Sequence, residues 1–295
     1  MSACVRRTAP TVIYATLALL AFAANSVLCR LALREAAIDP ATFTSIRVVS
    51  GAVMLLVVML WTRGNIHSAA ASSWASSAML FLYAAPFSFA YTRLNAGTGA
   101  LILFGAVQVT MLVSAARSGD TLQPLQWLGF VIALAGLVYL VLPGLTAPPP
   151  SAAALMAIAG MFWGIYTLRG RGAPDPLAQN TINFVRAIPP VIGVSILAMQ
   201  QMHVSTRGVA LAVVCGALTS GLGYAVWYSA LRGLTATRAA VLQLMVPVLA
   251  AAGGVAFLME PVSLRLAVSA LLVIGGIALT LARQFRLNPG RTGLT

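Results

Sequence analysis

Ten apolar segments, each close to the length that crosses a lipid bilayer, dominate this chain of 295 residues. A helix needs about 20 mostly apolar residues to cross a hydrocarbon core of about 30 Å. The segments that meet this criterion are residues 12–33, 41–62, 74–92, 97–116, 124–142, 152–168, 180–199, 208–231, 236–258 and 263–282. Because backbone groups must be hydrogen-bonded internally within lipid, these segments predict an all-α polytopic membrane protein.

The composition indicates the same class. Hydrophobic residues make up 60% of the chain and charged residues only 8%, and the mean hydropathy is +0.94. Soluble proteins carry about 25% charged residues. The net charge of +13 comes from arginine alone, since the sequence contains no lysine. These arginines are scattered between apolar runs and do not cluster on a soluble face, so we expect no nucleic-acid partner.

The arginines also predict the orientation, because cytoplasmic loops retain positive charge. With the N-terminus inside, eleven arginines fall on the cytoplasmic side and five on the other, while Arg47 and Arg186 lie within spans. We therefore expect both termini to lie in the cytoplasm and the protein to lie in a bacterial inner membrane. The N-terminal apolar run continues to Leu33, beyond the roughly 7 to 15 residues of a signal peptide, so we interpret it as the first span.

The two halves of the sequence resemble each other. A shift of 139 residues aligns Arg47 with Arg186, and a shift of 140 aligns Asp120 with Glu260. Each half holds five predicted spans, an odd number, so the second half enters the membrane from the opposite side. We expect two inverted five-helix repeats, residues 1–146 and 147–295, that form one membrane domain.

Several features of the second half carry a family resemblance. They are WGIYTLR at 163–169, an aromatic-rich helix, a helix that contains Pro247, the terminal Glu260, and a final helix with a Gly-Gly pair. They resemble the ten-helix EamA-type exporters of the drug/metabolite transporter (DMT) superfamily. The first half departs from this pattern, since residues 24–25 are Ala-Asn instead of Trp-Gly and Asp120 replaces the glutamate.

The resemblance covers the whole chain and implies a secondary transporter that exports amino acids or other metabolites. Within the family, the overall form is similar to the YddG-type aromatic amino-acid exporters. The resemblance is a fold signal and does not specify the substrate. A carrier of nucleobases, sugars or drugs, or a membrane subunit that does not transport, is the alternative.

Aromatic and amide side chains inside the apolar runs are the candidate substrate site. Polar groups at that depth tend to face the bundle interior or a water-filled cavity. The predicted cavity residues are Asn25, Tyr83, Phe87, Gln108, Trp163, Tyr166, Tyr224, Trp227, Tyr228 and Gln243. For Tyr91, Trp227 and Tyr228 an interfacial aromatic belt is an equal alternative. Such a cavity, without fixed charge, suits small amphipathic solutes, because ring faces stack on apolar groups or attract an ammonium group.

Three further residues receive specific predictions. Arg47 and Arg186 lie about seven residues inside their spans, roughly 10 Å deep, from where a long side chain snorkels to water or bonds helix-end carbonyls. We interpret them as symmetry-related structural anchors, with direct substrate contact as the alternative. Pro247, close to Gln243, is the predicted gating hinge, because prolines within spans often mark kinks.

The sequence also limits the chemistry. All five acidic residues and both histidines fall in predicted loops or at span ends, so we expect no carboxylate relay near the bilayer midplane and flux down the substrate gradient. The sequence has no GxxxxGK[ST] or HExxH motif, so we expect neither ATP use nor an enzyme. The three cysteines lack the spacing of a metal or disulfide framework, so no metal or cofactor is expected. The expected partners are a small-molecule substrate and the lipid bilayer, with the protein functional as a monomer.

Overall fold

The computed structural model describes residues 2–63, 73–117, 124–144, 147–170, 173, 175–231, 233–234 and 242–287. Its long helices are α1 (Ser2–Arg34), α2 (Pro40–Arg63), α3 (Trp74–Tyr91), α4 (Ala96–Arg117), α5 (Pro124–Val141), α6 (Pro150–Gly170), α7 (Pro176–Leu197), α11 (Met245–Leu258) and α12 (Leu264–Leu287). Between α7 and α11, α8 (Thr206–Val214), the π-helix η3 (Cys215–Leu222) and α9 (Gly223–Leu231) form one continuous segment, preceded by the short 3₁₀ helix η2 (Met199–Gln201).

The helices confirm the predicted fold class. Seven helical segments of the described chain are long and apolar enough to cross a membrane, and Met245–Leu258 and Leu264–Leu279 are shorter apolar helices. Together with α3, they account for all the predicted spans within the part of the chain that the structure describes. The chain is therefore an all-α polytopic membrane protein. The predicted boundary between residues 146 and 147 falls in the connection between α5 and α6 and stays a prediction.

The helix boundaries follow from local sequence signals. Helices α2, α5, α6 and α7 each begin with proline. Proline has no backbone N–H, and this costs nothing in the first turn of a helix, where the N–H groups have no partner within the helix. The side-chain oxygens of Ser73, Asp175 and Ser205 accept a backbone N–H of the first turns of α3, α7 and α8, which satisfies one of the free donors there. These signals position the spans along the chain before any tertiary contact forms.

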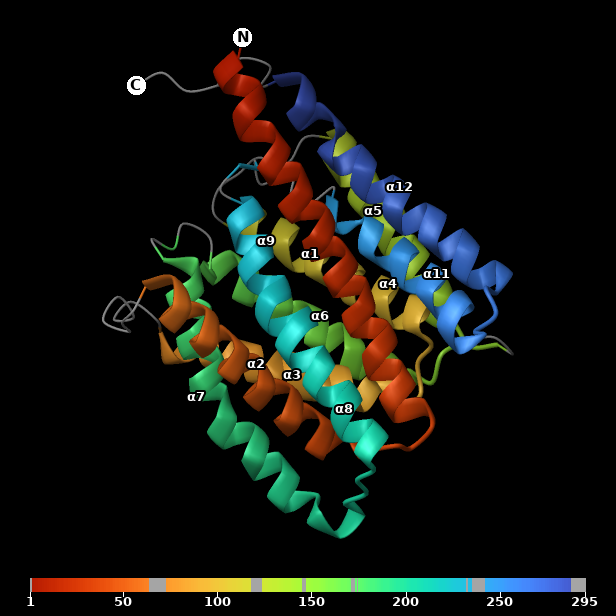
Figure 1. Ribbon diagram of the computed structural model, residues 1–295. Coiled ribbons are helices and arrows are strands. Elements are labelled where there is room, and N and C mark those ends of the chain that lie inside the picture. Colours follow the sequence, from red (N-terminus) through yellow and green to blue (C-terminus); the bar gives the residue numbers. More distant parts are fainter. Residues whose placement is uncertain are drawn as a thin grey trace.

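Most helices pack against helices of the other half. Helix α1 contacts α9 and α11, whereas α6 contacts α3 and α4; α2 packs on α7, and α5 packs on α12. When each helix is replaced by its counterpart in the other half, the pair α1–α9 becomes α6–α3 and the pair α1–α11 becomes α6–α4. The pairs α2–α7 and α5–α12 stay the same, as an inverted repeat requires. Figure 1 shows α5 with α12 on one side of the bundle and α2 with α7 on the other.

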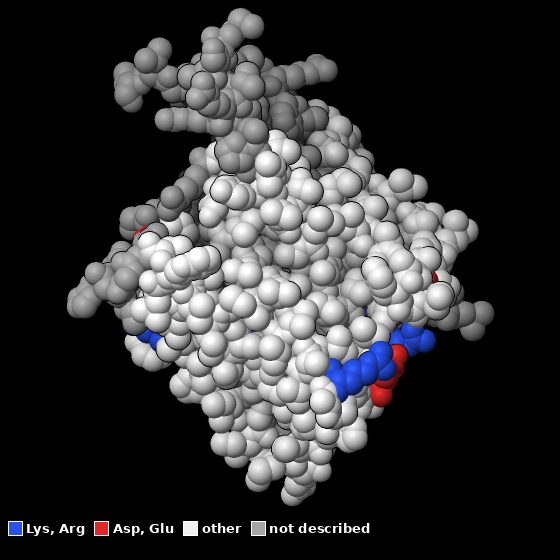
Figure 2. Space-filling model, viewed as in Figure 1, with Lys and Arg blue, Asp and Glu red and all other residues white. Residues whose placement is uncertain are grey.

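The outer surface is apolar. Figure 2 shows a face of the described chain that is almost uncharged, with its few charged side chains at the lower right and at the left margin. Large hydrophobic side chains such as Trp61, Leu197 and Phe257 are mostly exposed. A surface of this kind is stable against lipid tails, because they are as apolar as the side chains that they contact.

A buried ion pair joins four segments at one end of the bundle. Arg30 Nε of α1 lies 2.9 Å from Glu260 Oε1, and Arg30 Nη1 donates to the carbonyl oxygens of Tyr91 and Thr92 at the end of α3. Glu260 Oε2 accepts the backbone N–H of Ala96, the first residue of α4, at 2.8 Å. Both charges are thus satisfied by several partners, which a buried ion pair needs in order to offset its desolvation.

We expect Glu260→Gln to lower the free energy of unfolding by about 3 kcal/mol, because it leaves the buried guanidinium of Arg30 without its counter-charge. The matched control is Glu35→Gln, which removes the carboxylate that pairs with Arg207 on the exposed surface and should cost at most about 1 kcal/mol. Thermal unfolding of the purified protein in detergent measures both. Equal shifts for the two variants would contradict the structural role of the Arg30–Glu260 pair.

Candidate functional site

A closed cavity lies between helices of both halves. Its wall consists of Phe22, Asn25 and Ser26 from α1, Tyr83 and Phe87 from α3, Leu103 and Phe104 from α4, Trp163 from α6 and Tyr224 from α9. None of these residues is more than 5% exposed. The volume that the centre of a water molecule can occupy in this cavity is only about 10 Å³, which is enough for about one water molecule. The cavity is therefore closed in this structure and has no room for a larger solute.

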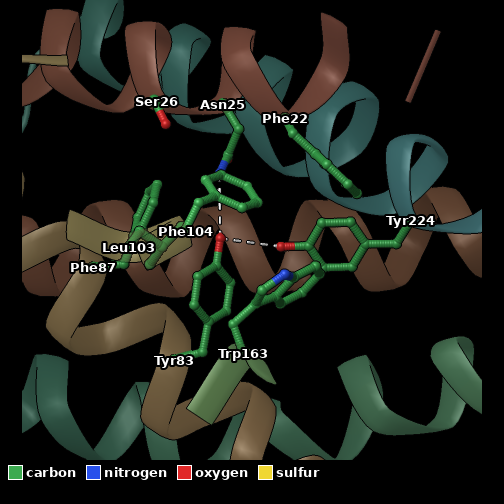
Figure 3. A pocket seen from close by; sticks show the side chains of 9 residues that line it. All are labelled: Phe22, Asn25, Ser26, Tyr83, Phe87, Leu103, Phe104, Trp163 and Tyr224. Atoms are coloured by element: carbon green, nitrogen blue, oxygen red, sulfur yellow. Dashed lines mark hydrogen bonds between the residues drawn. The ribbon is translucent and has the colours of Figure 1, made fainter. Parts of the chain in front are cut away.

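Polar groups of two other wall residues and of Arg47 converge on the hydroxyl of Tyr83. Asn25 Nδ2 and the Tyr224 hydroxyl each lie 3.3 Å from Tyr83 OH (Figure 3). Arg47 Nη2, behind the wall, donates to the same oxygen at 3.0 Å and lies 3.5 Å from Tyr224 OH. These contacts join α1, α2, α3 and α9 through one small polar cluster, which we call the hydroxyl cluster: Asn25, Arg47, Tyr83 and Tyr224.

Trp163 forms the floor of the cavity and packs against both tyrosines of the hydroxyl cluster. Its ring centroid lies 4.9 Å from that of Tyr83 and 4.7 Å from that of Tyr224. The ring of Phe22 makes T-shaped contacts with Trp163 and Tyr224, at centroid distances of 5.9 and 5.8 Å. The indole nitrogen of Trp163 is buried and has no hydrogen-bond partner within the described chain. The cavity thus offers ring faces together with an unused N–H donor.

Arg47 does not reach water, and the expectation that it snorkels to a helix end is wrong. It is only 2% exposed. Its Nε donates to Ser220 Oγ at 3.0 Å, and its guanidinium carbon lies 4.8 Å from the ring centroid of Phe87. Arg186, its partner in the repeat, is half-buried and lies 4.8 Å above the exposed ring of Trp74. The two arginines therefore have different surroundings, and their role as anchors stays a prediction.

The π-helix η3 brings the eighth span close to Arg47. A Cβ at Gly216 would lie 2.0 Å from Ser50 Oγ and 2.2 Å from the carbonyl oxygen of Arg47, so only glycine fits there. The wide turn also directs the Cys215 thiol and the Thr219 and Ser220 hydroxyls at Asn25 Oδ1, at 3.0 to 3.4 Å. Single π-turns inside α-helices are frequent at functional sites. The sequence of this segment is the small and hydroxyl-bearing run CGALTSGLG.

The structure brings half of the predicted cavity residues to the cavity wall: Asn25, Tyr83, Phe87, Trp163 and Tyr224. The other half are buried elsewhere in the bundle: Gln108, Tyr166, Trp227, Tyr228 and Gln243. The wall also contains the apolar residues Phe22, Leu103 and Phe104 and the small Ser26, which were not predicted. Apolar side chains in an apolar span carry no local signal for a cavity, whereas Phe22 precedes Asn25 by about one helical turn and Ser26 directly follows it.

Two of the residues outside the wall, Tyr166 and Trp227, pack against it from behind. Tyr166 donates to Asn180 Oδ1 at 2.5 Å and its ring lies 5.7 Å from Trp163. Trp227 meets Phe22 edge-on at a centroid distance of 5.7 Å. A Cβ at Gly170 would lie 2.4 Å from Tyr228 OH, so Tyr228 packs against the end of α6. Gln243 is 1% exposed, and its Nε2 has no partner among the described residues.

The alternative of an interfacial belt is wrong for Tyr91, Trp227 and Tyr228, because all three are buried. The exposed tryptophans are instead Trp61, Trp74 and Trp127, which lie at the end of α2 and the starts of α3 and α5. Since successive spans run in opposite directions, these three helix ends lie on the same side of the membrane. They are the residues that suit a membrane interface.

Pro247 begins a helix and does not interrupt one. It is the third residue of α11, and the helical segment before it is broken by a turn at Leu244. Proline is tolerated in a first turn, where its missing donor has no partner in any case. The break precedes the proline by three residues, and the role of Pro247 as a hinge stays a prediction.

The described acidic residues have partners away from the cavity. Glu35 pairs with Arg207 and Glu260 with Arg30. Asp39 accepts the backbone N–H groups of Thr42 and His203, and Asp175 caps α7. Asp120 and His67 lie outside the described residues. Within the described chain, no three His, Cys, Asp or Glu side chains gather to bind a metal ion.

Comparison with known proteins connects this architecture to a family. The EamA-like transporter family matches residues 9–142 and, a second time, residues 150–282. An uncharacterised protein of Pseudomonas aeruginosa is 51% identical over 272 residues, which cover 92% of this chain and 94% of the relative. An uncharacterised transporter of Archaeoglobus fulgidus is 24% identical over 283 residues, which cover 91% of this chain and 96% of the relative.

The fold also occurs in a solved structure. A protein with a crystal structure and 18% sequence identity superposes with a TM-score of 0.63, over 90% of this chain and 96% of its own. At that identity, the likeness shows the fold alone. The double match to one family confirms that the sequence contains two copies of the same repeat.

We expect Tyr83→Phe to lower the free energy of unfolding by about 1 to 3 kcal/mol, because Asn25 and Arg47 lose a buried acceptor. Tyr139→Phe is the matched control, since Tyr139 is 38% exposed and its ring would still face Arg265. Thermal unfolding in detergent compares the two variants. A Tyr83 variant as stable as the Tyr139 variant would show that the hydroxyl cluster does not stabilise the closed state.

Proposed function

The chain belongs to the EamA-like transporter family, and we propose that it exports small amphipathic metabolites, amino acids foremost, by secondary transport. It is a membrane transporter of the drug/metabolite type. The proposal adds a substrate class and a mechanism to that family membership. Aromatic and hydrophobic amino acids are favoured, and transport follows alternating access between the two repeats.

The single observation that carries this proposal is a closed cavity with walls from both repeats. Helices α1, α3 and α4 come from the first repeat, and α6 and α9 come from the second. In inverted-repeat transporters the substrate site lies at the interface of the repeats, which rock against each other. All wall residues are buried, and we interpret this closed arrangement as the step of the proposed cycle at which access is closed to both sides.

The chemistry of the wall supports an amphipathic solute. The rings of Phe22, Phe87 and Trp163 suit an apolar or aromatic side chain. Asn25 and the tyrosine hydroxyls are suited to a polar head group. A carrier for another class of solute, such as nucleobases, sugars or drugs, is the second candidate, because ring faces and amides also bind those compounds.

The cavity supports a carrier that runs down the substrate gradient. No acid or histidine lies in the cavity wall, whereas proton-coupled carriers commonly place such a group inside the membrane. The cavity is also complete within one chain, which supports a functional monomer. The arginine distribution supports an inner-membrane location with both termini in the cytoplasm.

We expect the purified protein in proteoliposomes to show counterflow of radiolabelled phenylalanine, tyrosine or leucine. Trp163→Ala should weaken the apparent affinity about tenfold, since an aromatic contact contributes up to about 1.5 kcal/mol. Trp127→Ala, at a tryptophan that is 51% exposed on α5, is the matched control and should leave transport unchanged. Counterflow of nucleobases or sugars in the absence of any amino-acid flux would favour the second candidate.

Flux should not require a proton gradient, because the described cavity wall contains no group that titrates near neutral pH. Proteoliposomes loaded with labelled substrate, at equal pH on both sides and then with an imposed pH difference, measure this. We expect similar initial rates under both conditions. Strict dependence on the pH difference would contradict transport down the substrate gradient alone and would place a proton-binding group outside the described cavity wall.

A further inference from the structure

The hydroxyl cluster contains a positive charge that no acidic side chain within the described residues neutralises. Arg47 is 2% exposed, and its guanidinium contacts the phenols of Tyr83 and Tyr224, the hydroxyl of Ser220 and the ring of Phe87. The described acidic residues are engaged elsewhere: Glu35 and Glu260 by arginines, Asp39 and Asp175 by backbone N–H groups. A buried cation without a counter-charge is costly, so its retention calls for an explanation.

The same cluster also has more donors than acceptors. Three donors, from Asn25, Arg47 and Tyr224, point at the single oxygen of Tyr83, which has at most two lone pairs to offer. If Tyr83 instead donates to Tyr224, the Tyr83 oxygen can accept from both Asn25 and Arg47. The hydroxyl proton of Tyr224 is then the donor that has no acceptor. Asn25 Oδ1 is already occupied by Cys215, Thr219 and Ser220. The remaining acceptor is the Tyr224 oxygen, which accepts from Arg47 Nη2 at 3.5 Å, so the donors of the cluster outnumber its acceptors.

Two further buried donors of the same region are unpaired. Arg47 Nη1 and Trp163 Nε1 have no hydrogen-bond partner within the described chain. Trp163 lines the cavity, and its ring packs on both Tyr83 and Tyr224. Buried donors in native proteins are nearly always paired, so a group of unpaired donors around one cavity indicates a missing acceptor.

We propose that this missing acceptor is the carboxylate of the substrate, held by the hydroxyls of Tyr83 and Tyr224 and the indole N–H of Trp163, with the Arg47 guanidinium as its counter-charge. The inference rests on the proposed transport function and specifies which part of the solute the site recognises. A carboxylate has two oxygens that only accept hydrogen bonds. It therefore supplies the two things that the cluster lacks, which are acceptors and a negative charge.

Arg47 lies one layer behind the wall, and this position defines its role. Its Nη2 contacts both phenols, at 3.0 and 3.5 Å, and the phenols face the cavity. The guanidinium polarises these hydroxyls toward the cavity in the closed state. When the repeats separate to admit a solute, its unpaired Nη1 becomes available to the carboxylate as a charge-assisted donor.

The same cluster argues against recognition by an ammonium group. No described carboxylate faces the cavity, and a cation would meet the like charge of Arg47 close by. A single buried positive charge also balances one negative charge, so the site favours monocarboxylates over dianions such as phosphate monoesters. The amino group of an amino acid is thus tolerated by the site and is not what the site selects.

Three analogues of one solute test this inference on the wild-type protein: phenylalanine, 3-phenylpropionate, which lacks the amino group, and 2-phenylethylamine, which lacks the carboxylate. Each is added as an unlabelled competitor in phenylalanine counterflow at neutral pH. We expect 3-phenylpropionate to inhibit within about tenfold of phenylalanine and 2-phenylethylamine to be about 10- to 100-fold weaker, as for loss of a hydrogen bond to a charged group. The opposite order would overturn the inference.

Arginine variants provide the second measurement. Arg47→Gln should abolish the preference for 3-phenylpropionate over 2-phenylethylamine, and Arg47→Lys should retain part of it, because lysine keeps the charge without the planar fork. Arg186→Gln is the matched control, since Arg186 is the repeat partner of Arg47 and packs on the exposed Trp74. It should leave the preference unchanged. A preference that survives in Arg47→Gln would overturn the role of Arg47.

Ligand-induced thermal stabilisation in detergent separates the two proposals. If no solute is transported but 3-phenylpropionate stabilises the wild-type protein and not Arg47→Gln, the transport proposal fails and the carboxylate site stands. If amino acids are transported but only 2-phenylethylamine stabilises the protein, transport stands and the carboxylate site fails. Stabilisation by none of the three compounds also overturns the site. The wild-type comparisons remain decisive even if Arg47→Gln does not fold.

Discussion

The structure depends on satisfying one guanidinium group in the apolar interior. Arg47 extends from α2 to hydroxyls on α3, η3 and α9, and its flat face lies on the ring of Phe87. A charge in such surroundings is tolerated only when its donors are largely paired. The positions of four segments around the cavity are therefore coupled, since a shift of any one of them would leave more of this charge unpaired.

Close approach of the backbones makes these contacts possible. Glycine at position 216 lets η3 contact α2 beside Arg47, and Gly160 lets α6 contact α4, where a Cβ would lie 2.4 Å from the carbonyl oxygen of Leu103. Helices in lipid associate through such close packing because no hydrophobic effect drives them together. At the far end of α1, the Arg30–Glu260 pair closes the bundle with charges that are fully engaged. The two buried arginines of the described spans thus differ, since one is neutralised and the other is not.

This contrast connects the fold to the proposed activity. A fully paired charge stabilises a closed arrangement, whereas an unpaired charge beside a cavity favours a ligand of opposite sign. An occluded cavity with room for about one water is compatible with transport only if the two repeats move apart. The contacts that cross between the repeats, such as those of α1 with α9 and of α6 with α3, are the ones that must change during that movement.

The sequence by itself determined the fold class, the spans, the repeat and the family, because span length, arginine placement and the internal repeat are properties of the chain alone. It also located five of the nine wall residues: Asn25, Tyr83, Phe87, Trp163 and Tyr224. Only the tertiary structure decided that Phe22 faces the cavity, that Tyr166 and Trp227 stand behind it, and that Arg47 points inward. In a soluble helix the polar face reveals the orientation. In a membrane both the lipid and the protein interior are apolar, so the rotation of each span is set by packing against its neighbours.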